Sequence, residues 1–158
     1  ADVMADVYRP LFLRDFPSAP DDPLGQLYAG RSDRLTGRTK AALGTLQKHE
    51  RAIRAAGLRV PWEREMVLAL LDADLPARAQ RIARASTDRD GDPYFELLVA
   101  AYRRDVAAAA RLAELLIDEK GYSPEGLLED EILAEALQDP GLAPIRERFF
   151  SEVSPAEP

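Results

Sequence analysis

Prolines recur in this chain at a spacing that matches one pair of antiparallel helices. Pro61, Pro93 and Pro124 each stand just before a run with helical apolar periodicity, and the steps from 61 to 93 and from 93 to 124 are 32 and 31 residues. A repeat period of this size is typical of stacked helical hairpins, and proline is favoured in the first turn of a helix. The spacing therefore predicts an all-α fold of about seven helices, with its last three hairpins stacked as a short α-solenoid.

The length and composition predict one globular domain with an irregular arm at its start. The chain has 158 residues, of which 46% are apolar, and its most frequent apolar residues are good helix formers. Four prolines break up residues 1–30, but the segment from Tyr8 to Phe16 is too apolar for a free tail. We expect residues 1–30 to pack on a helical domain at 31–150, with partner docking as the alternative. Residues 151–158 should fray.

Two glycines stand inside the first predicted helix. Ser32 or Asp33 is a suitable N-cap and Gly57 a suitable stop, which predicts a helix over residues 32–56. Gly37 and Gly44 lie seven residues apart within that range. Because glycine weakens a helix, this pair indicates either a close approach of another helix or a break near Gly44.

The rest of the chain reads as three helical hairpins. We predict helices over residues 61–73 and 76–86, followed by a loop at 87–91, and then over 93–102 and 106–119, with 93–102 at the buried centre. A single helix should follow over 124–137, and a last element over 140–149. Asp92 and Asp139 precede prolines as capping residues, and Gly121 is a left-handed stop.

Few residue types suited to catalysis or metal binding are present. The chain has no cysteine and one histidine, His49, so a disulfide and a multi-histidine metal site are excluded within one chain. We expect His49 to be a packed or half-exposed helix residue, the acidic residues 125–135 to form a solvated face, and no cofactor or metal to be needed. No apolar run approaches the ~20 residues of a membrane span. We expect a soluble cytoplasmic protein, with a mature periplasmic protein as the alternative.

Charge is distributed unevenly along the chain. Residues 31–84 carry twelve basic and six acidic groups, net +6, whereas residues 85–158 carry seven basic and seventeen acidic groups, net −10. Two explanations stay open. The molecule has two faces of opposite potential, or the two halves use different charges for solubility.

Residues 61–150 resemble the helical hairpins of tetratricopeptide repeats. Phe95, Leu98, Val99 and Tyr102 have the spacing of that family's first helix, and Met66, Ala69, Leu70 and Ala73 follow it more loosely. The stretch from Leu137 to Phe149 is similar to the closing element of many bacterial proteins of this type. The resemblance implies a concave surface that binds a peptide or a partner helix, and it implies no catalysis.

These observations favour a protein–protein interaction module, such as an adaptor, regulator or assembly factor. Arg and Trp are enriched at binding hot spots, so Trp62, Arg78, Arg81 and Arg84 are the predicted interaction surface. The competing interpretation is that Trp62 belongs to the core and the arginines to a solvated face.

Two other functions remain as alternatives. Residues 62–84 superficially resemble the helix-turn-helix start of response-regulator DNA-binding domains, with the basic residues of 78–84 facing a groove. The acidic stretch 88–92 and the net charge of −7 argue against nucleic acid as the partner. The second alternative is an enzyme of unrecognised type with a pocket between helices.

Overall fold

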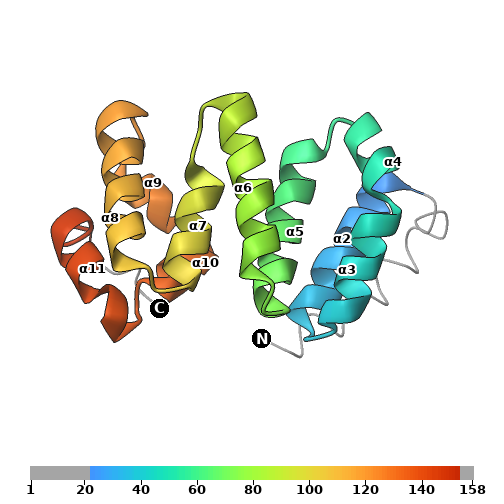
Figure 1. Ribbon diagram of the computed structural model, residues 1–158, viewed down its shortest axis with the longest axis horizontal. Helices are drawn as coiled ribbons and strands as arrows, with labels where there is room; N and C mark the ends of the chain where they lie inside the picture. Colours follow the sequence, from blue (N-terminus) through green and yellow to red (C-terminus); the bar gives the residue numbers. More distant parts are fainter. Residues whose placement is uncertain (1–21, 154–158) are drawn as a thin grey trace. The chain divides into compact units, whose positions relative to one another are not determined.

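A computed structural model describes residues 22–153, which form ten α-helices, one π-helical turn and one 3₁₀ turn, with no strand in this range (Figure 1). The all-α prediction is confirmed. None of the described helices is long and apolar enough to cross a membrane. The α-helices are α2 (Pro23–Leu35), α3 (Thr39–Lys48), α4 (Glu50–Ala55), α5 (Arg59–Asp72), α6 (Pro76–Asp90), α7 (Tyr94–Tyr102), α8 (Val106–Glu114), α9 (Pro124–Leu128), α10 (Glu131–Ala136) and α11 (Ala143–Phe149).

The chain divides into two compact units, Ala1–Ile82 and Ala83–Pro158. In the first unit, α2 and α3 lie side by side, and α5 packs on both of them and on α4 (Figure 1). Of the predicted N-terminal arm, residues 1–21 lie outside the described residues, as do residues 154–158 of the predicted tail. Residues 23–30, predicted to be irregular, are helical instead. Pro23 begins α2, where its missing N–H costs nothing.

The single helix predicted over residues 32–56 is wrong. Ser32 and Asp33 lie in the last turns of α2, and the chain reverses at Gly37, whose φ is +77°. Gly37 therefore ends a helix rather than lining a helix contact. A second interruption falls at His49, between α3 and α4, and not at Gly44. The predicted stop at Gly57 is confirmed, with φ also +77°.

The close helix contact of the first unit occurs at Gly30 in α2. A Cβ atom built on Gly30 would lie 2.7 Å from two side-chain carbons of Leu46 in α3, whereas one on Gly44 would meet nothing within 4 Å. Leu46 is completely buried, so it cannot move into solvent to make room. The absence of a side chain at Gly30 is thus what lets α2 approach α3.

Helix α5 is the centre of the first unit. From Trp62 to Leu71 every residue except Arg64 is buried, including two glutamates. An apolar segment of this kind is surrounded by packing partners, which α2, α3 and α4 supply.

In the second unit, α7 and α8 form a hairpin, α10 packs on α7 and α11 packs on α8. The predicted burial of residues 93–102 is confirmed for α7, where Phe95 and Leu97 to Ala101 are buried. Helix α8 continues through a π-helical turn, Leu115–Glu119, to a left-handed Gly121, as the sequence indicates. A 3₁₀ turn, Pro140–Leu142, precedes α11 and is capped by Asp139.

Two predicted boundaries in this part of the chain are wrong. Residues 87–90 are helical and form the last turn of α6. The Thr87 hydroxyl donates a hydrogen bond to the Ala83 carbonyl, and the Thr87 carbonyl accepts one from the N–H of Gly91. The predicted helix 124–137 is broken at Asp130. The Asp130 carboxylate accepts the N–H of Ile132 at 2.9 Å and starts α10 as an N-cap.

Two helices end on residues other than glycine in the left-handed conformation. Asp74 (φ 57°) follows α5 and Arg104 (φ 55°) follows α7. In both turns the next N–H bonds back to the last helical turn, from Leu75 to the Leu70 carbonyl at 2.8 Å and from Asp105 to the Ala100 carbonyl at 2.9 Å. This pattern satisfies carbonyls that the helix end leaves free, which offsets a backbone cost of about 1 kcal/mol.

Candidate functional site

The exposed side of α6 carries the three arginines that the sequence singles out. Pro76 occupies the first position of the helix, and alanine and arginine, both good helix formers, are the most frequent residues that follow. The opposite side consists of small residues, Ala79, Ala83 and Ser86, all buried. Arg78, Arg81 and Arg84 are exposed and follow one another at three-residue spacing. Side chains three apart neighbour each other along a helix, so α6 presents a row of guanidinium groups, the α6 arginine face.

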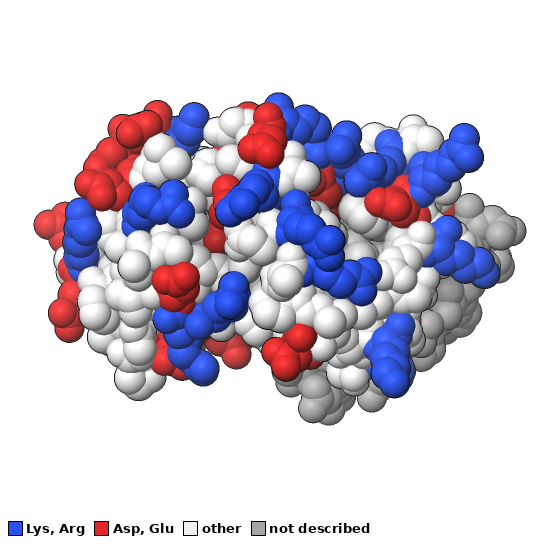
Figure 2. Space-filling view, in the orientation of Figure 1, with Lys and Arg blue, Asp and Glu red and all other residues white. Residues whose placement is uncertain are grey.

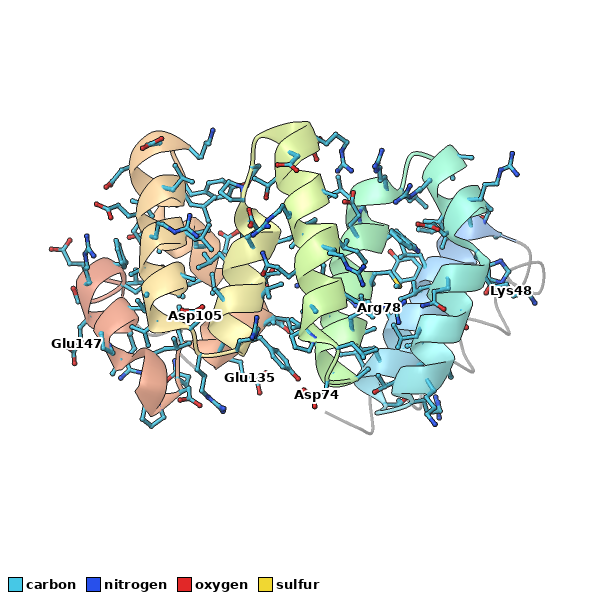
Figure 3. The ribbon with its side chains drawn as sticks, viewed as in Figure 1. Lys48, Asp74, Arg78, Asp105, Glu135 and Glu147 are labelled. Atoms are coloured by element: carbon cyan, nitrogen blue, oxygen red, sulfur yellow. The ribbon has the colours of Figure 1, made fainter. Side chains whose placement is uncertain are left out.

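These arginines have few counter-ions. Arg84 Nε lies 4.0 Å from Glu96 Oε1, and the Arg84 side chain is 69% exposed. Arg78 and Arg81 form no ion pair within residues 22–153. Arg78 and Arg81 belong to the first unit and Arg84 to the second. Figure 3 shows Arg78 on α6, well apart from Lys48 at the end of α3.

Trp62, the fourth residue of the predicted surface, lies in the core of the first unit. It is 3% exposed, and its indole Nε1 donates a hydrogen bond of 2.8 Å to the Leu46 carbonyl. The Arg54 guanidinium lies 5.0 Å from the centroid of the ring. The indole thus joins α5 to α3, and the Leu46 carbonyl satisfies the polar N–H of the ring. Of the four residues of the predicted surface, only the three arginines are therefore exposed.

Three carboxylates of the first unit are buried, each against an arginine. Glu65 of α5 accepts a hydrogen bond of 2.9 Å from Arg34 of α2, whose side chain is 7% exposed. Arg64 contributes a second cation 3.6 Å from Glu65. Asp33 pairs with Arg38 at 3.0 Å, and Glu63 lies 3.5 Å from Arg59. Burying a carboxylate is costly unless a cation compensates its charge, so these pairs belong to the structure of the unit.

The buried carboxylates leave the exposed charges of residues 22–82 predominantly basic. Residues 22–82 contain eleven basic and seven acidic side chains, net +4. Arg34 is the one buried basic group in this range, whereas three of the seven acidic groups are buried. The exposed or half-buried charges are therefore ten basic and four acidic. On the one face that Figure 2 draws, basic side chains prevail over acidic ones across the first unit. Residues 83–153 carry eight basic and sixteen acidic groups, net −8.

The second unit contains a cluster of two tyrosines and two aspartates. Tyr94 donates a hydrogen bond of 2.5 Å to Asp130, Tyr122 donates one to Asp92, and the two phenol rings stack with centroids 6.1 Å apart. Burial, followed by the hydrogen bond to Asp92, raises the pKa of Tyr122 to about 12. Each aspartate also caps a helix start with its other oxygen. The cluster joins α7 to the segments on either side of α9, and all four side chains have structural partners.

The described residues contain no group of three or more His, Cys, Asp or Glu side chains that could hold a metal ion. His49 is half-buried at the junction of α3 and α4, which agrees with the prediction of a packed or half-exposed residue. Asp139 has its pKa lowered, chiefly by the backbone N–H of Gly141 and next by the Arg104 guanidinium. These contacts hold the start of a helical turn.

The buried ionic pairs of the first unit were not predicted from the sequence. The available signal was the position of Glu63 and Glu65 in a segment, 62–71, that is otherwise apolar except for Arg64. Carboxylates in such a segment have to be paired, and arginines stand at several positions of the neighbouring helices. The sequence does not indicate which arginine pairs with which carboxylate.

Comparison of the chain with protein-family models, with curated proteins and with solved structures finds no match.

Proposed function

We propose that this chain is a protein-binding module, acting as an adaptor, regulator or assembly factor, and that its partner contacts the α6 arginine face. The observation that carries the proposal is the exposure of Arg78 and Arg81 without ion pairs in the described part of the chain. Free guanidinium groups in a row suit multidentate contact with a partner, because each presents several N–H donors in a fixed plane.

The α6 face is favoured over exposed loop positions because its arginines lie on a helix. They project from one continuous helix, Pro76–Asp90, on the side opposite buried Ala79 and Ala83. A partner that binds this row would not have to order a loop, which lowers the entropic cost of binding.

We also propose that the helices form tetratricopeptide-like hairpins. Two observations support this: Pro61, Pro93 and Pro124 stand in or next to the first turns of α5, α7 and α9, and in the second unit α10 and α11 pack on α7 and α8 in the same order. In such arrays successive hairpins stack and leave one surface for a partner.

Site-specific photocrosslinking tests the binding role. A photoreactive amino acid at exposed Ala77 of α6, in lysate of the source cells, should capture a defined partner, whereas the same group at exposed Ala52 of α4 should not. Arg78→Glu/Arg81→Glu should abolish the capture. The matched control is Lys48→Glu/Arg51→Glu, which makes the same charge change on exposed residues of the same unit and should leave the capture intact. Equal capture by all variants, or equal loss in both double variants, would refute the proposal.

A further inference from the structure

We infer that the partner segment bound by the α6 arginine face is a short acidic protein segment with two or three carboxylates spaced over about 9 Å. The inference rests on the proposed function and names the chemistry of the partner. It depends on the charge pattern along α6, on the exposed charge of the first unit and on the charge of the second.

The length of the basic row limits the length of its ligand. Arg78 and Arg84 are six residues apart, which at a rise of about 1.5 Å per residue separates them by about 9 Å along the helix. Carboxylates three or four residues apart on a partner helix lie about 5–6 Å from each other and match the spacing of neighbouring arginines. A segment of two helical turns is therefore enough to pair with the whole row.

The charge pattern beyond Arg84 disfavours a long polyanion. The next exposed charged residue of α6 is Asp88, followed by Arg89 and Asp90, which pair with each other at 2.6 Å. A nucleic acid laid along the helix would bring phosphates towards Asp88, and residues 83–153 have a net charge of −8. Nucleic acid binding depends on an extended positive footprint, which the C-terminal end of α6 lacks.

The guanidinium groups themselves favour carboxylates as ligands. Arginine binds carboxylate in a bidentate manner, and the exposed or half-buried charges of residues 22–82, ten basic and four acidic, attract an acidic segment before contact. Exposed ion pairs are individually weak, so two pairs contribute about 2- to 25-fold to affinity. The acidic segment thus supplies specificity and a faster encounter, and further contacts of the partner supply the remaining affinity.

The test is a nuclear magnetic resonance titration of the full chain, labelled with ¹⁵N. One probe is an octaglutamate peptide, and the other is an eight-nucleotide oligothymidylate of nearly the same charge, at the same salt concentration. The peptide should shift the amide signals of residues 77–85 and bind more tightly than the oligonucleotide. Arg78→Glu/Arg81→Glu should weaken peptide binding about 5- to 25-fold, and Lys48→Glu/Arg51→Glu less than twofold.

Each of the following outcomes would overturn the inference. Tighter binding of the oligonucleotide at α6 would make this face a nucleic acid interface. Shifts centred on other helices, or equal weakening by both double variants, would show attraction by net charge alone. Self-association through α6 in sedimentation, without peptide binding, would identify a second copy as the ligand. If octaglutamate fails to bind but the α6-dependent crosslinks persist, the acidic chemistry of the partner is refuted and the proposed function is not. If the crosslinks are lost as well, the proposed function is refuted too.

Discussion

Replacing Gly30 with alanine should destabilise the first unit, although alanine is the better helix former. In a helix interior, Gly→Ala contributes about 1 kcal/mol of stability through backbone propensity. At Gly30 the new Cβ would lie 2.7 Å from two carbons of Leu46, well inside the ~3.5–4.0 Å of a favourable carbon contact. Leu46 is fully buried, and overpacking of this kind costs about 1–3 kcal/mol.

The expected net effect of Gly30→Ala is a loss of about 1–2 kcal/mol, since the buried Leu46 places the steric cost in the upper part of its range. The matched control is Gly44→Ala in α3, where a Cβ meets nothing within 4 Å. Only the propensity term acts there, so Gly44→Ala should gain about 1 kcal/mol. The two variants should therefore differ by about 2–3 kcal/mol in the free energy of unfolding.

Urea unfolding of the full chain, followed by circular dichroism at about 222 nm, measures both effects as shifts of the midpoint. The double variant Gly30→Ala/Leu46→Ala removes the clash and should lose less than the sum of its single variants. The reasoning is refuted if Gly30→Ala is as stable as the unsubstituted chain or more stable, or if the double variant is additive.

Three further predictions concern turns and titrating groups. Asp74→Gly should raise the free energy of unfolding by about 0.5–1 kcal/mol in the same urea experiment, because Asp74 has a left-handed backbone, with φ 57°, which glycine adopts more readily. A lower free energy of unfolding would contradict this. Tyr122, whose pKa is raised to about 12 by burial and by its hydrogen bond to a carboxylate, should ionise well above pH 10 in an ultraviolet titration. Because the unfolded chain ionises its tyrosines near pH 10, stability should fall as pH rises from about 10 to 12, and less so in Tyr122→Phe. The pKa of Asp139 is lowered, so the contribution of Asp139 to stability should be lost as pH falls below the ordinary range of aspartate. Arg104→Gln should raise this pKa in a nuclear magnetic resonance titration. It should not restore the ordinary value, because the larger cause, the N–H of Gly141, remains.

The site could be predicted from the sequence only in part. The row of arginines on α6 follows from three-residue spacing and from the small residues opposite, both of which are local properties of residues 76–90. The exposure of Arg78, Arg81 and Arg84 agrees with this. Trp62 was grouped with them by residue type, but its indole pairs with a carbonyl sixteen residues earlier in the chain. A contact of that kind depends on how α5 lies against α3, which helical periodicity does not determine.

The sequence by itself determined the all-α class, the helical position of most later segments and several of the helix ends. The caps at Asp92 and Asp139 and the stops at Gly57 and Gly121 were predictable, because each depends on the φ angle or hydrogen bonds of neighbouring residues. The burial of α7 was predictable as well, because its apolar residues cover every side.

Tertiary structure alone decided two other features: the approach of α2 to α3 at Gly30 and the burial of Glu65 against Arg34. Each arises from residues far apart in the sequence. Gly30 meets Leu46 of another helix, and Glu65 and Arg34 are 31 positions apart. The physical reason is that a buried carboxylate or a missing side chain is favourable only when a specific distant group fills the space or supplies the opposite charge. Local sequence therefore specified the helices, and packing between them decided which charges stayed at the surface.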